Sequence, residues 1–184
     1  NNDCELGQII ADAFRGVDET GIVTMEQTVE SETKVNIVDG VEYDKGLTNM
    51  AFVTSQSSKT AELENPLILL VESPVESIRK IQSVLEYVIK SNKSLLIVAD
   101  CEQAVISALA MNKTKGNIKV NVINAPTYGV NKKDTLNDLA LLTGATVINE
   151  DLGDDVDLIT PDMLGTCIKS VTSQNDTILQ VTKD

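Results

Sequence analysis

The stretch PLILLVESPVESIRKIQSVLEYVIKSNKSLLIVAD, from Pro66 to Asp100, predicts a βαβ crossover. Two apolar runs, Leu67 to Val71 and Leu95 to Ala99, lack polar alternation, which is typical of parallel strands buried on both faces. Between them, apolar side chains recur at three- and four-residue intervals, as in an amphipathic helix that covers a sheet. This apolar arc is wider than one-sided cover requires, so its edge is a candidate binding surface.

The length and composition predict one core with an appended segment. The chain has 184 residues, of which 42% are hydrophobic, and single domains commonly run to about 100 to 200 residues. No apolar run is long enough to span a membrane, and the first residues do not resemble a signal peptide. The first residue is not Met, so we expect a fragment of a longer protein, from which targeting signals would be lost.

Charge and cysteine content exclude several classes of protein. The net charge of −13 repels the phosphates of nucleic acids and the headgroups of anionic membranes, so neither is an expected partner. Cys4, Cys101 and Cys167 are widely spaced, which argues against a disulfide framework or a structural zinc site and favours a reducing compartment. We expect these thiols to be partly buried and inert.

Before the crossover, the pattern predicts a helix from Asp3 to Phe14 and two short strands, residues 22–25 and 33–38. The turn pair Asp39-Gly40 marks a domain boundary. Residues 41–60 are turn-rich and are expected to form a loop or a short irregular strand.

After the crossover, the pattern alternates helices and strands. Leu136, Leu139, Ala140 and Leu142 are expected to point inward from a helix that Gly144 ends. The expected elements are a helix over 102–115, a strand over 118–123, that helix over 134–143, a strand over 145–148, a short helix from residue 160, and a hairpin of 167–172 with 177–181.

Few residues could carry catalysis. The chain has no His, which removes the commonest general base and most catalytic zinc sites. Neither of the glycine-rich phosphate-binding motifs is present, and the acidic residues 150–157 lack the spacing of a calcium loop, so this segment is expected to be solvated. One alternative remains: a metal-assisted enzyme domain with a doubly wound sheet, using carboxylates at strand ends such as Asp100 and Glu150.

Apolar surface is the other candidate for function. The helix over 102–115 is apolar nearly all round, which predicts either burial on two sides or one side left for a partner. Two successive crossover helices on one side of a sheet leave a groove that can take an apolar segment of another chain. Composition alone favours ordinary core residues over such a groove. One captured Leu-sized side chain would contribute about 1.5 to 3 kcal/mol before ordering costs, so binding through a few contacts would be weak.

Six motifs in order and at matching spacing resemble the group I chaperonins, the GroEL type of bacteria and organelles. They are DGVEYDKG from Asp39, ENP from Glu64 with ILL from Ile68, VLE from Val84, LLIVA from Leu95, AP from Ala125 with Gly129, and LTG from Leu142 with TVI from Thr146.

The resemblance implies an α/β fold: a chaperonin apical-domain-like mixed sheet flanked by helices over residues 39–184, lacking its C-terminal helices. Residues 1–38 would be a small α+β segment of the intermediate domain. The equatorial domain, which binds ATP and Mg²⁺, would lie outside this sequence. The compartment would be the cytoplasm of a bacterial or phage-infected cell, or an organelle matrix or stroma.

The implied function is molecular chaperoning within an ATP-driven homo-oligomeric ring. A groove between two helices would capture non-native polypeptides and a GroES-type co-chaperonin, with no catalytic residue and no metal in this part. The implied contact positions are Leu47, Ala51, Phe52, Gln82, Leu85, Ile106, Ala110 and Met111.

Several of these positions depart from the family. Members commonly have aromatic residues at Leu47 and Ala51, Leu at Gln82 and Val at Ala110. We therefore expect weaker or narrower client binding than in a typical member, and a regulatory paralog with weak client binding is a further alternative.

Overall fold

The computed structural model describes residues 4–16, 40–125, 130–154 and 158–181. The chain divides into two compact units, residues 1–39 and 40–184, each described by itself below. The strands predicted at 22–25 and 33–38 lie outside the described residues. Within the described part, no helix is long and apolar enough to cross a membrane.

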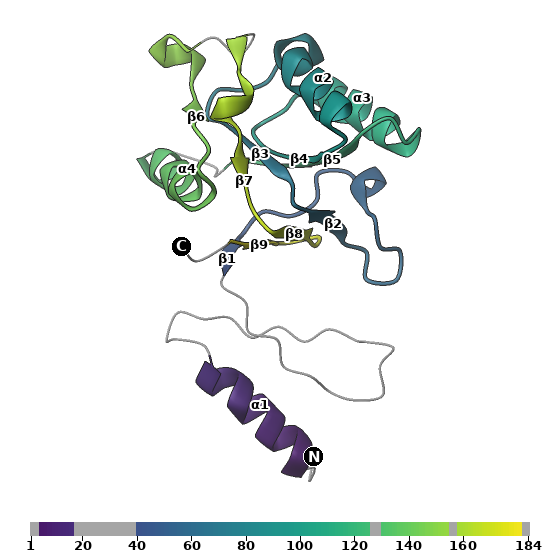
Figure 1. Cartoon of the computed structure of the whole chain (residues 1–184), viewed down its shortest axis with the longest axis vertical. Helices are drawn as coiled ribbons and strands as arrows, with labels where there is room; N and C mark the ends of the chain where they lie inside the picture. Colours follow the sequence, from purple (N-terminus) through teal and green to yellow (C-terminus); the bar gives the residue numbers. More distant parts are fainter. Residues whose placement is uncertain (1–3, 17–39, 126–129, 155–157, 182–184) are drawn as a thin grey trace. The chain divides into compact units, whose positions relative to one another are not determined.

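Figure 1 shows a mixed α/β architecture. The longer helices are α1 (Cys4–Gly16), α2 (Gln82–Ser91), α3 (Gln103–Thr114) and α4 (Val130–Thr143). The strands are β1 (Gly40–Tyr43), β2 (Ala61–Glu64), β3 (Leu67–Val71), β4 (Ser94–Val98), β5 (Lys119–Ile123), β6 (Val147–Ile148), β7 (Gly165–Thr166), β8 (Lys169–Thr172) and β9 (Thr177–Gln180). Short 3-10 helices are η1 (Met50–Phe52), η2 (Ile78–Ile81), η3 (Glu150–Leu152) and η5 (Pro161–Met163).

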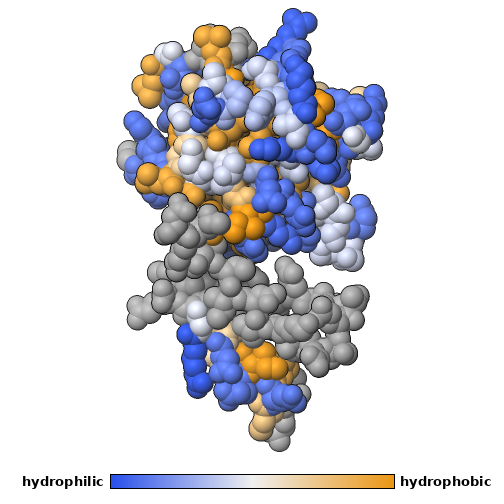
Figure 2. All heavy atoms as spheres, in the orientation of Figure 1, coloured by the Kyte–Doolittle hydropathy of each residue, from blue (hydrophilic) through white to orange (hydrophobic). Residues whose placement is uncertain are grey.

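The first unit contains the predicted N-terminal helix, α1. None of its described side chains is buried, and the apolar ones lie along one side of it (Figure 2). Asp12 accepts hydrogen bonds from Gln8 and Arg15 on the polar side. The prediction of a helix is confirmed, but Cys4 is exposed, so the expectation that every thiol is partly buried was wrong.

The predicted crossover forms the centre of the second unit. β3 and β4 are parallel neighbours, with Leu67 opposite Leu95, and every residue of both strands is buried. The sheet has the order β5-β4-β3-β6, and β7 joins the edge of β3 in the antiparallel direction. The predicted mixed sheet is therefore confirmed at the level of an α/β fold.

Side-chain alternation along β3 divides the core into two layers. Leu67, Leu69 and Val71 face a core that includes α2 and α3, while Ile68 and Leu70 face a second core. Because both crossovers from β3 to β4 and from β4 to β5 step in the same direction, a right-handed connection places α2 and α3 on the same face. The step back to β6 places α4 on the opposite face, where it contributes Leu136 and Leu139 to the second core.

A smaller antiparallel sheet, β1-β9-β8-β2, also packs on the second core. Tyr43, Leu63 and Leu179 are its buried apolar contributions. β8 and β9 form the predicted hairpin, with Ser173 bonded to Asp176 across the turn. Within this sheet, only the β8–β9 pair joins strands that are adjacent in the sequence. The β1–β9 and β2–β8 pairs join segments that lie far apart in the sequence.

The segment 41–60, expected to form a loop or a short irregular strand, begins within the four-residue strand β1, for which β9 supplies a partner from the far end of the unit. Three other predictions were wrong in detail. α4 starts at Val130 rather than Asp134, and β6 has only two residues. Leu142 is exposed, because Leu136, Leu139 and Thr143 take the inward positions and Thr143 donates to the carbonyl of Leu139.

Candidate polypeptide-binding surface

The segment that precedes β2 is fixed against α3 and β5. Asn49 accepts a hydrogen bond from the amide of Ala51 and so caps η1. Thr48 donates to the carbonyl of Val122, at 2.9 Å. Lys113, near the end of α3, donates from Nζ to the carbonyl of Val53, at 2.8 Å. These bonds hold η1 against α3, and the two elements pack together.

The eight implied contact positions differ in exposure. Phe52, Ile106 and Ala110 are core side chains, with exposed fractions of 0%, 6% and 5%. Leu47, Ala51 and Leu85 are partly buried and pack on the same core. Gln82 is exposed and donates to Glu86, and Met111 is also exposed. A ligand could therefore reach mainly Leu47, Ala51, Gln82, Leu85 and Met111.

The α3 helix is apolar nearly all round because it packs against other elements on two sides. Val105, Ile106, Leu109 and Ala110 are all buried, and the helix packs both on β5 and on η1. The sequence left open whether such a helix is buried twice or kept free for a partner. Both descriptions apply, since most of α3 is core and Met111 alone among its large apolar side chains is strongly exposed.

The predicted contact positions included Met111 but missed two other residues of this surface, Met50 and Ile89. Met50 in η1 is 53% exposed and Met111 is 59% exposed. Ile89, on the outer edge of the α2 arc, is also exposed. Met50 carried a signal, because it stands in the apolar run from Leu47 to Val53. We call the exposed Met50, Ile89 and Met111, together with the partly buried Leu85, the exposed apolar set, since they belong to elements covering one face of the sheet.

The alternative site at the carboxyl ends of the strands is occupied by the protein's own contacts. Both carboxylate oxygens of Glu150 accept a hydrogen bond from Nζ of Lys80, at 2.8 and 3.0 Å. The carboxylate of Asp100 forms an ion pair with Lys132, at 3.2 Å. Asn149 donates to Glu72 at 2.9 Å. Among the described residues no group of three or more His, Cys, Asp and Glu could hold a metal ion. At this edge, Asp100 and Glu150 are therefore already engaged in ion pairs with lysines.

Cys101 lies at the same edge, directly after Asp100. Burial, with a smaller contribution from the Asp100 carboxylate, raises the pKa of the Cys101 thiol to about 12. A thiol of that pKa is neutral near pH 7 and is a poor nucleophile. The expected partial burial of this thiol is confirmed, and its low reactivity remains a prediction.

No protein-family model matches this sequence.

Proposed function

We propose that residues 40–184 form a chaperonin apical-type domain that captures non-native polypeptides and a GroES-type co-chaperonin through the exposed apolar set. One observation carries the proposal: Met50 and Met111 are both more than half exposed, on two elements that pack together. Methionine is unbranched and polarizable, and it is used at surfaces that accept many partners. Such side chains suit ligands that share apolar character without sharing a sequence.

The capture step is hydrophobic. An apolar side chain of the client would cover Met50 or Met111 and lose its own contact with water, contributing about 1.5 to 3 kcal/mol before ordering costs. One unit therefore binds weakly. In a homo-oligomeric ring, several units would hold one chain at once, and the effective concentration would raise the total affinity. ATP and Mg²⁺ would act in a different domain, so the proposal gives this unit no catalytic residue.

The exposure of individual residues supports a weak version of this function. Phe52, Ile106 and Ala110 are buried, and Gln82 places a polar amide at the start of α2. Figure 2 shows apolar residues on the visible face in patches separated by hydrophilic ones. We infer a narrower range of clients than for a typical member, which also fits a regulatory paralog.

Binding of a denatured model protein, followed by fluorescence anisotropy with the full chain, tests the proposal. The double variant Leu85→Glu with Met111→Glu should lose affinity by about tenfold or more, since each charged group must be desolvated on binding. Leu141→Glu is the matched control, because Leu141 is exposed on α4 and lies outside the proposed surface. Circular dichroism checks that each variant is folded. Equal affinities of the double variant and the control would sink the proposal.

A further inference from the structure

A concave site lies at the amino-terminal edge of β4 and β5. Its volume is about 940 Å³, and its walls include Ser94, Lys119 and, on β2, Glu62 and Glu64. Ligands of open α/β sheets usually bind at the opposite edge, beyond the carboxyl ends of the strands. In this protein that edge is closed by contacts of Lys80, Glu150 and Asn149, whereas the amino-terminal edge opens onto this cavity.

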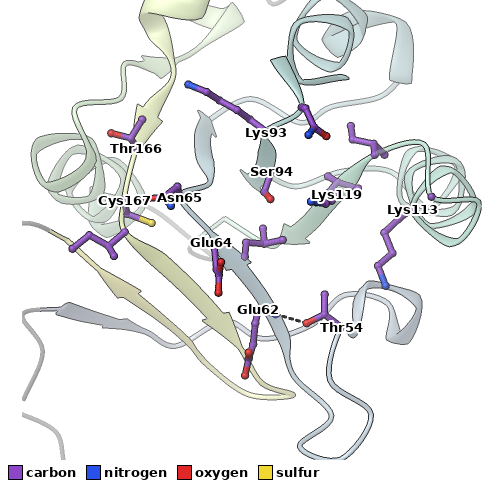
Figure 3. A pocket seen from close by; sticks show the side chains of 16 residues that line it. Thr54, Glu62, Glu64, Asn65, Lys93, Ser94, Lys113, Lys119, Thr166 and Cys167 are labelled. Atoms are coloured by element: carbon purple, nitrogen blue, oxygen red, sulfur yellow. Dashed lines mark hydrogen bonds between the residues drawn. The ribbon is translucent and has the colours of Figure 1, made fainter. Parts of the chain in front are cut away.

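Ser94 is the best-positioned polar group in the cavity. Only 8% of the residue is exposed, and its hydroxyl has no hydrogen-bond partner among the described residues. Figure 3 shows this hydroxyl and the Lys119 ammonium group extending toward the centre of the cavity, with Glu64 on the opposite wall. The hydroxyl opens onto the cavity, where a ligand could supply its hydrogen-bond partner.

Lysines outnumber carboxylates on the cavity wall, which carries Lys93, Lys113 and Lys119 together with Glu62 and Glu64. Lys119 forms no ion pair within the described part of the chain, whereas Lys113 is bonded to the carbonyl of Val53 and Glu62 lies 3.8 Å from Lys169. No Asp or Glu occurs between residues 87 and 99 or between residues 103 and 133. An overall acidic protein therefore concentrates lysines at this end of the sheet, where they would attract an anion.

We propose that this cavity binds a small organic anion through a carboxylate or phosphate group held by the Lys119 ammonium and the Ser94 hydroxyl. Glu64, across the cavity, accepts a hydrogen bond from a hydroxyl or ammonium group of the same molecule. The ligand class is thus a hydroxy- or amino-substituted carboxylate or phosphate. This site is separate from the exposed apolar set, so it does not rest on the proposed capture of polypeptides.

Isothermal titration calorimetry and amide chemical shifts of the full chain test the site with four probes. O-phosphoserine and malate carry the anion with an ammonium or hydroxyl group, inorganic phosphate carries the anion alone, and ethanolamine carries the ammonium and hydroxyl groups without an anion. We expect binding of O-phosphoserine or malate at one site, with shifts centred on Ser94 and Lys119. Ethanolamine should not bind, and inorganic phosphate should bind more weakly.

Two variants and a matched control separate a site from general attraction. Lys119→Gln and Ser94→Ala should each weaken binding about tenfold, the usual effect of losing a hydrogen bond to a charged group. Lys115→Gln makes the same charge change at the same end of the sheet but outside the cavity wall, and should change affinity less than about twofold. Equal losses in the two lysine variants, or absence of binding by both substituted anions, overturn the proposal. Equal binding of inorganic phosphate and O-phosphoserine overturns the role of Glu64.

Discussion

Asn121 in β5 donates a hydrogen bond from Nδ2 to Oγ1 of Thr172 in β8, at 2.9 Å, and so joins the two sheets through their common core. The Thr172 hydroxyl lies 3.1 Å from that of Thr177, which donates to the carbonyl of Lys45 at 2.7 Å. Asn121, Thr172 and Thr177 are fully buried. A polar chain thus connects the parallel sheet to the hairpin and to the segment that follows β1.

Asn121→Ala should destabilise the second unit by about 1 to 3 kcal/mol, because it leaves the Thr172 hydroxyl short of a partner and removes buried atoms. Urea unfolding followed by circular dichroism measures the change. Asn117→Ala is a suitable control, since Asn117 is exposed and makes a longer bond, of 3.3 Å, to Asn112. Equal midpoints for the two variants would show that the inter-sheet bond contributes little.

Ile106→Ala and Met111→Ala should separate core from surface within α3. Ile106 is buried, so its truncation should cost about 2 to 5 kcal/mol, whereas Met111 is exposed and its truncation should change stability by less than about 0.5 kcal/mol. Only Met111→Ala should weaken client binding without a change in thermal stability. A similar loss of stability in both variants would place Met111 in the core.

Gly46→Ala should destabilise the second unit through a backbone clash. A Cβ atom at Gly46 would overlap the carbonyl of Gln174 in the turn between β8 and β9, and overpacking typically costs about 1 to 3 kcal/mol. Thermal unfolding provides the measurement. Gly7→Ala is the opposite control, because nothing lies within 4 Å of its added Cβ in α1 and Ala favours helix. A stable Gly46→Ala variant would mean that the turn moves aside freely.

The three thiols should react with Ellman's reagent at different rates. Burial raises the pKa of Cys167 to about 11 and, together with Asp100, that of Cys101 to about 12, so both remain protonated at pH 8. Cys4 is exposed. One thiol should react quickly in the folded protein and all three after unfolding in urea. Raising the pH toward 11 should accelerate the labelling of Cys167 before that of Cys101. Fast labelling of all three thiols at pH 8 would contradict the burial of Cys101 and Cys167.

Divalent metal ions should leave the melting temperature unchanged. Asp100 and Glu150 are paired with lysines, and a metal would have to displace both partners before it gained its ligands. Differential scanning fluorimetry with Mg²⁺, Zn²⁺ or EDTA tests this expectation. A rise with a metal ion that EDTA reverses, and that Glu150→Gln abolishes, would instead support the metal-dependent enzyme.

The crossover and the hairpin could be predicted because their signals are local. Leu67 to Val71 and Leu95 to Ala99 are uninterrupted apolar runs, and Ser173 to Asp176 is a turn between two alternating strands. β1 could not be predicted in this way, since it becomes a strand only through β9, at the other end of the unit. Its short sequence carries little signal of its own.

The candidate surface could be predicted only as a set of apolar positions. In the sequence, Ile106 and Met111 are equally apolar members of one helix. They differ in exposure because Ile106 lies in the core and Met111 at the surface. The packing of η1 on the same helix is fixed by Asn49, Thr48 and Lys113. Each of those polar residues reads as part of an ordinary turn or helix end, so no pattern identifies the pairing.

The β1–β9 ladder places Gly40 opposite Gln180. The first and last strands of the second unit are therefore neighbours, and the start of β1 lies beside the end of β9. A module of this kind can be spliced into a surface loop of an unrelated host protein without stretching either junction. It can also be circularly permuted: a short linker would join its present ends, and new ends could be opened at the exposed turn of residues 56–59.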